Sequence, residues 1–135
     1  MRLGEKQEFF MRLLPRLIDK AHELGFEIRG GDLFRDPRLH GHVGHNTVAY
    51  YATSVYSALK TLFREVGYKG YGYSKSCHKY KLAIDLNLTK GGVLVTTTEG
   101  HRELGEWWEA QHELCCWGGR FNDGNHYSLS HNGSK

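Results

Sequence analysis

The sequence predicts an α+β fold, a small antiparallel sheet with helices packed on one side and an open face on the other. Apolar residues recur every three or four positions over residues 5–24 and 47–66, as in amphipathic helices. Leucine and isoleucine alternate with small or polar residues over 82–88, as in a half-buried strand. The 135 residues are 39% hydrophobic and 24% charged, which fits one globular domain, 1–135, around one core.

The first elements are a helix and a strand. The apolar face of residues 5–24 ends before Gly25, a typical helix cap, while Pro15 must either kink this helix or begin a second one. A strand is expected over residues 26–34, and the polar run 35–38 then turns the chain away.

Two stretches between residues 39 and 73 are expected to border a cleft, one on each side of a helix over 47–66. His40, His42 and His45 lie among glycines, which favours a flexible polar loop over a metal site, although contact with a substrate stays open. The helix 47–66 follows. Tyrosines then alternate with glycines up to Tyr73; such a segment can stack nucleic-acid bases or wall a cleft, and we favour the cleft because the segment runs directly into His78.

Strand parity places the first candidate site residues. In the strand 82–88 the leucines face the core, so Asp85 lies on the opposite face beside the small Ala83. His78 precedes Asp85 by an odd number of positions and would point to the other face of a continuous strand. For both to hold one ion, His78 must lie in a loop that curls back over the sheet.

The remaining elements complete the sheet and its cover. A turn rich in glycine leads to a returning strand over 93–96, and a helix is expected over 99–112 with Trp107 and Trp108 among its apolar anchors. A core strand is expected over 114–121. The turn 122–125 then brings Asp123 and His126 into one pocket, and His126 begins a further extended stretch.

Two imidazoles and one carboxylate form the ligand set of a catalytic zinc site, with the fourth position left for water. The second aspartate, Asp123, is then a candidate general base for that water. Each of the short motifs that contain these residues is, alone, a weak indication of a metal site. The ordered set is more specific: Ser76-x-His78, an Ala-x-Asp that ends at Asp85, Trp-Gly-Gly from Trp117, and an Asp-x-x-His that ends at His126.

On these motifs the chain resembles the zinc peptidases that include D-alanyl-D-alanine carboxypeptidases and phage L-alanyl-D-glutamate endopeptidases, and the phage endolysin branch is the more similar. The resemblance covers about residues 26–129 and implies the hedgehog/D-Ala-D-Ala peptidase-like fold. It implies Zn²⁺ as cofactor, held by three ligands, and a hydrolase that acts as a bacteriophage endolysin in peptidoglycan degradation and cell wall lysis. The ligands would be His78, Asp85 and His126.

The resemblance also assigns roles around the metal. Asp123 would be the general base, and Arg35 would hold substrate or stabilise the oxyanion. Ser76 would position the metal site or the substrate, and Tyr73 and Trp117 would wall the cleft. Two positions depart from the family: Lys81 stands where many members have glycine, and Asp123 where many have glutamate. The turn after His78 is therefore expected to differ in shape.

Two alternatives stay open. One is a D-Ala-D-Ala carboxypeptidase with the same site and a different cleft. The other is a zinc-stabilised, non-enzymatic binding module in which Cys77 and Cys115 complete a closed site. The net charge of +3 is too small to choose between a cell wall and nucleic acid.

The N-terminus lacks the apolar run of a signal peptide, and the three cysteines are expected to stay reduced. With the resemblance, this predicts a monomer without a membrane anchor, with peptidoglycan rather than nucleic acid as partner. The protein would accumulate in the host cytoplasm and reach the cell wall after membrane permeabilisation.

Overall fold

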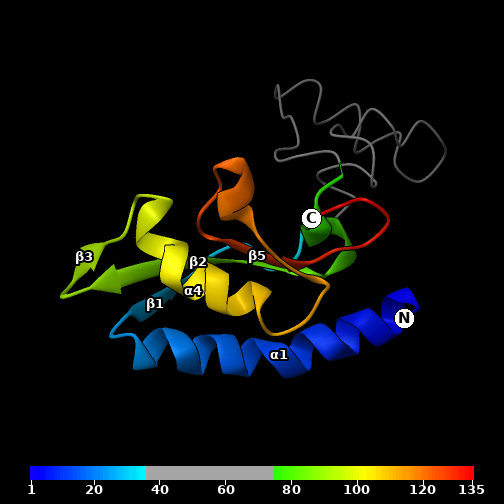
Figure 1. Ribbon diagram of the computed structural model, residues 1–135, viewed down its shortest axis with the longest axis horizontal. Coiled ribbons are helices and arrows are strands. Elements are labelled where there is room, and N and C mark those ends of the chain that lie inside the picture. The colour runs from blue at the N-terminus through cyan, green and yellow to red at the C-terminus, as the bar shows by residue number, and fades with distance from the viewer. Residues whose placement is uncertain (36–74) are drawn as a thin grey trace, which may run out of the picture.

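The computed structural model describes residues 1–35 and 75–135, which form two α-helices and a small antiparallel sheet (Figure 1). The helices are α1 (Leu3–Glu23) and α4 (Arg102–Glu109). The strands are β1 (Glu27–Gly30), β2 (Ala83–Lys90), β3 (Val93–Leu94), β4 (Cys115–Trp117) and β5 (His126–Leu129). This confirms the α+β prediction in its coarse form. The expected helix 47–66, the histidine loop and Tyr73 lie outside the described residues.

The sheet has the order β1-β2-β5-β4, with β3 paired to β2 as a hairpin, and every pairing is antiparallel. Gly91 and Gly92 form the hairpin turn with positive φ, where glycine carries no steric penalty. The long strand β2 lies at the centre. In its pairing with β5, Asp85 stands opposite His126 and Ile84 opposite Tyr127.

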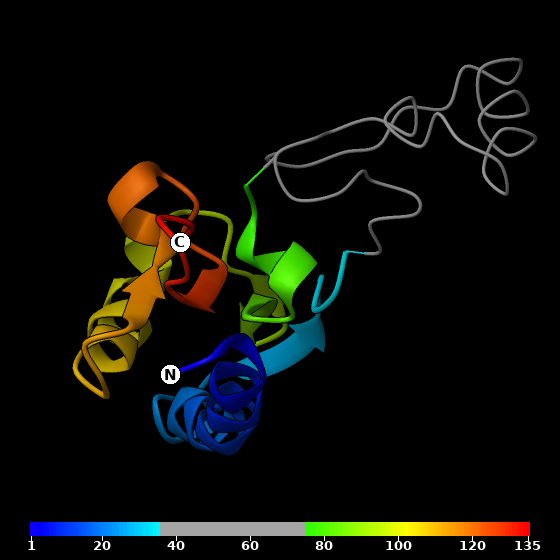
Figure 2. The ribbon, with the colours of Figure 1, turned by 90° about the vertical axis from the view of Figure 1, so that its right-hand side faces the viewer.

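The core lies between the helices and one face of the sheet. Phe10 of α1 meets Trp108 of α4 edge-to-face at 6.1 Å, and both side chains are fully buried. In Figure 2 the two helices lie side by side. The sheet contributes buried side chains to this core, among them Leu86, Leu88 and Tyr127. Side chains alternate along a strand, so Asp85 lies on the opposite face, as strand parity predicts, and its cross-strand partner His126 lies on that face with it.

Several predicted boundaries need correction. At the exposed Pro15 the first of the two expected outcomes holds: helix α1 continues through it with a bend, and no second helix begins there (Figure 1). The expected strand 26–34 ends at Gly30, and the expected helix 99–112 is the 3₁₀ turn Glu99–His101 followed by α4. The expected strand 114–121 stops at Trp117, because a 3₁₀ helix, Gly118–Phe121, turns the chain towards Asp123.

Candidate metal centre

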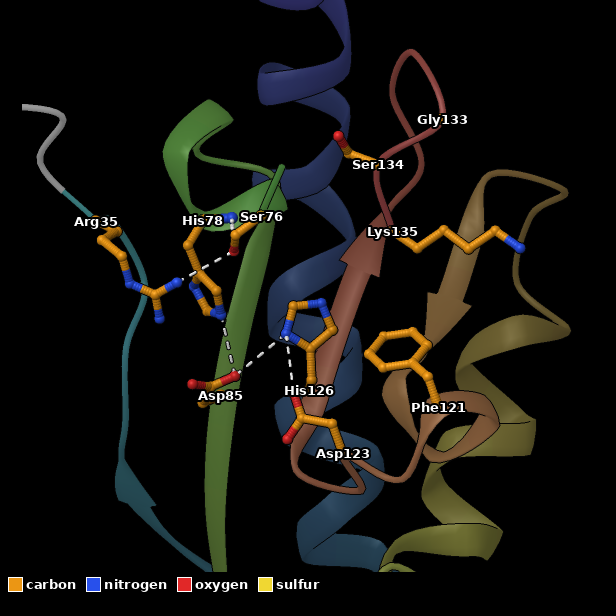
Figure 3. Close-up of a pocket in the computed structure, with 10 residues that line it drawn as sticks. All are labelled: Arg35, Ser76, His78, Asp85, Phe121, Asp123, His126, Gly133, Ser134 and Lys135. Carbon is orange, nitrogen blue, oxygen red and sulfur yellow. Dashed lines mark hydrogen bonds and ion pairs between the residues drawn. The ribbon is translucent and has the colours of Figure 1, made fainter. Parts of the chain in front are cut away.

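A pocket of about 550 Å³ opens on the face of the sheet away from the core, and the predicted ligands lie at its centre (Figure 3). Its walls come from four parts of the chain that are distant in sequence: the segment after β1, the 3₁₀ helix before β2, β2 itself, and the region from the 3₁₀ helix after β4 to the last residues. The lining residues are Arg35, Ser76, His78, Asp85, Phe121, Asp123, His126, Gly133, Ser134 and Lys135.

His78 lies in a short 3₁₀ helix, Cys77–Tyr80, immediately before β2, which confirms the predicted loop position. Ser76 caps this helix, its Oγ accepting a hydrogen bond from the backbone N–H of His78 at 3.3 Å. Lys81 ends the helix in the left-handed conformation, with φ of 59°. This reversal of the chain brings the ring of His78 back over the strand.

The two nitrogens of His78 have different surroundings. Nδ1 lies 3.4 Å from the carbonyl oxygen of Leu33, and Nε2 lies 3.1 Å from Oδ1 of Asp85. With a metal bound at Nε2, the ring proton would lie on Nδ1 and be donated to the carbonyl oxygen of Leu33. Histidines that bind metals usually have such a second partner, which fixes the ring and its tautomer.

Asp85 is held at the centre of the site by its backbone. Its N–H donates to the carbonyl of Asp32 at 2.8 Å, although β1 has already ended. Gly31 lies so close that an added Cβ would come within 2.6 Å of the Asp85 carbonyl oxygen. Burial alone would raise the pKa of the Asp85 carboxyl, but hydrogen bonds from His126 and His78 outweigh it and hold the pKa well below its usual range. The carboxylate is therefore ionised, as a metal ligand must be.

His126 starts β5 and faces Asp85 across the strand pair. Its Nδ1 lies 3.4 Å from Asp85 Oδ1, and its ring meets that of His78 edge-to-face at 5.0 Å. Its Nε2 is buried and has no hydrogen-bond partner among the described residues. Phe121 packs against the outer side of the ring at 5.8 Å.

These three side chains fit a metal ion. One donor atom from each lies within 4.8 Å of the others, and no other group of three or more histidine, cysteine, aspartate or glutamate residues does so in residues 1–35 and 75–135. Zinc bonds of ~2.1 Å in a tetrahedron place neighbouring ligand atoms roughly 3.4 Å apart. The separations of 3.1 and 3.4 Å from Asp85 to the two imidazoles match that spacing.

Asp123 and Arg35 border the metal group from two sides. Asp123 Oδ2 lies 4.0 Å from Nδ1 of His126, and its side chain is half exposed, so it can reach a water in the pocket. Arg35 is buried, donates to Asp32 Oδ2 at 2.9 Å and to Ser76 Oγ at 3.3 Å, and lines the pocket. It comes from the segment after β1 rather than from the end of a strand, which corrects the predicted position.

Trp117 does not wall the cleft, so this part of the prediction is wrong. Its side chain is 1% exposed, and its Nε1 donates to the carbonyl of Gly124 at 2.7 Å. The ring packs against Gly105 of α4 and against Gly119, where an added Cβ would strike it. Trp117 therefore supports the turn that carries Asp123 from beneath, in the core.

Sequence reasoning missed two residues of the pocket wall. Phe121 is half exposed beside His126, and Lys135 brings a positive charge. The aromatic residue after a Trp-Gly-Gly motif is the signal that could have indicated Phe121.

The cysteines stay apart from the metal group. Cys77 Sγ donates to the carbonyl of Leu129 at 3.4 Å, and burial raises the pKa of both Cys77 and Cys115 to about 12. Neither belongs to the metal-binding group of the described residues. The alternative in which these two thiols complete a closed zinc site is therefore not supported by the structure.

No model of a known protein family matches the chain, and no curated protein matches its sequence. Among the described helices, none combines the length and apolar character needed to cross a membrane.

Proposed function

We propose that the protein is a zinc-dependent peptidase that cleaves the stem peptides of peptidoglycan, at the L-Ala–D-Glu bond, and acts as a phage endolysin in host cell lysis. The observation that carries this proposal is the grouping of His78, Asp85 and His126 in an open pocket that Asp123 and Arg35 also line. The finer fold assignment, that of the hedgehog/D-Ala-D-Ala peptidases, belongs to the same proposal.

Zinc bound by these three side chains would lower the pKa of a coordinated water to about 7 and polarise a peptide carbonyl. An open pocket supports a catalytic site over a structural one, since structural zinc sites are normally closed by four protein ligands. The half-exposed Asp123 faces the same space as the ligands, as a base for water requires.

The protein side chains have distinct roles in this proposal. Asp123 accepts a proton from the attacking water and returns it to the leaving amine, a contribution of about 10²–10⁴ in rate. Arg35 is positioned by Asp32 and Ser76, and its guanidinium stabilises negative charge on the substrate. Ser76 also has a structural role, because its hydroxyl caps the 3₁₀ helix that contains His78.

Digestion of purified murein, with and without a chelator, tests the proposal. We expect zinc-dependent release of peptides with a new N-terminal D-Glu, identified by mass spectrometry. Release of D-Ala instead would favour the carboxypeptidase, and an intact murein after incubation with the zinc-loaded protein would refute the peptidase.

Variants separate binding from turnover. His126→Ala is expected to lose zinc, whereas Asp123→Ala is expected to keep zinc and lose turnover. His22→Ala and Asp19→Ala remove the same side chains from exposed positions of α1 and serve as matched controls. Zinc at 100 times its dissociation constant should raise the free energy of unfolding by about 2.7 kcal/mol in the wild type but not in His126→Ala. Full lysis by both site variants would refute the assignment of the site.

A further inference from the structure

A second pocket, of about 330 Å³, adjoins the metal centre. It lies between the segment after β3 and the turn before β5, and Asp123 is the one lining residue that it shares with the metal pocket among those described. A group bound there would lie directly beside the proposed base. The volume is at the lower end of the range for small-molecule sites, about 300–1,000 Å³.

The chemistry of this second pocket differs from that of the metal pocket. The metal pocket carries the cations Arg35 and Lys135, whereas the second pocket contains no lysine or arginine among its described lining residues. Its polar groups are hydroxyls, amides and the imidazole of His101, and Asp123 brings the one carboxylate among the described lining residues. A group with a negative charge is disfavoured here, while a neutral group with hydroxyls and amides finds matching donors and acceptors. The polar lining includes Thr97, Thr98, Asn87, Asn122 and Asn125.

The backbone forms the walls of this pocket in advance. Val95 N–H donates to the Leu88 carbonyl at 2.8 Å, which ties the segment after β3 to the sheet. Gly124 lies against Thr98, where an added Cβ would come within 2.6 Å of the threonine Cα. The two walls are therefore in direct contact at one end, and little reorganisation is needed to bind a ligand.

The amides in this pocket retain capacity for a ligand. Asn125 Nδ2 donates a hydrogen bond to Asn87 Oδ1 at 3.4 Å, and Thr98 Oγ1 donates one to Asn122 Oδ1 at 3.5 Å. Within the described ranges these are the only hydrogen bonds of the Asn125 and Asn122 side chains. A primary amide can form up to about four hydrogen bonds. Both contacts are long, so a ligand can add to them or replace them.

We propose that the second pocket binds the N-acetylated sugar to which the stem peptide is attached, next to its first residue. This inference rests on the proposed function. In murein one side of the L-Ala–D-Glu bond carries carboxylates, and the other reaches the uncharged sugar after a single residue and its lactyl link. Two such units span roughly 7 Å, so the sugar must lie beside the metal centre. The pocket that Asp123 borders is in that position, and its neutral polar lining matches that group.

The test compares two substrates of the zinc-loaded protein: the stem peptide with and without its N-acetylmuramic acid. We expect kcat/KM to be about tenfold or more higher with the sugar. Asn122→Gly should lower this preference by roughly fivefold through loss of a hydrogen bond. Asn122 has φ of 62°, which glycine also adopts, so the turn keeps its shape. Thr98→Val removes a hydroxyl from a side chain of nearly the same volume and should also lower the preference for the sugar.

Asn132→Gly is the matched control, because Asn132 also has positive φ (48°) and lines neither pocket. It should leave the preference for the sugar unchanged. Equal kcat/KM for the two substrates in the wild type, or an unchanged preference in both pocket variants, would overturn the proposal.

A binding titration separates this inference from the proposed function. N-acetylmuramoyl-L-alanine and N-acetyl-L-alanine are titrated into the zinc-loaded wild type and into Asn122→Gly by calorimetry. Tighter binding of the sugar-bearing compound, lost in Asn122→Gly, supports the pocket even if no murein is hydrolysed. Equal binding of the two compounds overturns the pocket even if hydrolysis is found.

Discussion

A single methyl group at Gly118 should disturb both the stability of the protein and its metal centre. Gly118 is buried at the start of the 3₁₀ helix that leads to Asp123, and its carbonyl accepts a hydrogen bond from Asp123 N–H at 2.9 Å. In Gly118→Ala the new Cβ would overlap the carbonyl oxygen of Asp123 and come within 2.7 Å of His126 Cβ. One of these neighbours is backbone and cannot rotate away, so the turn itself must move.

The cost follows from those contacts. Overpacking of this kind destabilises proteins by about 1–3 kcal/mol. The displaced Asp123 carbonyl also accepts the N–H of His126 at 3.1 Å, and loss of that hydrogen bond adds about 1 kcal/mol. The total of ~2–4 kcal/mol corresponds to a fall in melting temperature of roughly 10 °C for a chain of this length. Displacement of His126 should also weaken zinc binding by about tenfold or more.

Thermal unfolding followed by circular dichroism in chelator measures the first effect, and a zinc titration measures the second. Gly30→Ala is the matched control, because it adds the same methyl group in β1, where nothing lies within 4 Å of it. The reasoning is refuted if Gly118→Ala melts no lower than Gly30→Ala and binds zinc as the wild type does.

Three further predictions concern the region around the site. Lys81→Val should lower the free energy of unfolding by about 1–3 kcal/mol, because a β-branched residue is strained at φ of 59°, whereas Lys81→Gly should not; equal stability of the two variants in urea would contradict this. Cys77 and Cys115, with pKa values of about 12, should resist iodoacetamide at pH 8 until the protein is unfolded, and rapid labelling of either in the native state, seen by mass spectrometry, would count against their burial. Burial lowers the pKa of His101, whose Nδ1 lies 2.9 Å from the Tyr127 hydroxyl, so the folded state binds this proton less readily than the unfolded state does. The stability that His101 contributes is therefore complete above the unfolded pKa of about 6.5 and is lost as pH falls below it. Urea unfolding at pH 7 and pH 5 should show a smaller fall in the free energy of unfolding for His101→Gln than for the wild type. An equal fall in the two proteins would refute this.

The residues that hold the centre could be predicted because their constraints are local. The alternation along β2 decides the face of Asp85, and the odd separation from Asp85 requires His78 to leave the strand. Both results depend only on strand parity, and the structure confirms both. Asp123 and His126 share one tight turn, so their proximity follows from the glycine in it.

The errors have tertiary causes. Trp117 is predicted from the sequence to wall the cleft, but its packing against Gly105 and Gly119 places it in the core. Arg35 was expected at the end of a strand, but its segment leaves the regular sheet at Gly30 and is held beside Asp85 and His78 by single backbone hydrogen bonds, Asp85 N–H to Asp32 and Arg35 N–H to His78. No periodic pattern records such contacts. The second pocket could not be foreseen either, since its walls meet only in the folded chain.

The register between β2 and β5 would give a metal ion bound at this site a role in folding. Asp85 stands opposite His126 in only one alignment of these two strands. A slip of one residue would send one of the two side chains to the core face, and a slip of two would separate them by about 7 Å along the strands. An ion that needs both ligands therefore stabilises the correct alignment and none of its neighbours. Zinc would in this way favour the correct pairing of β2 and β5 during folding, before it takes part in any reaction.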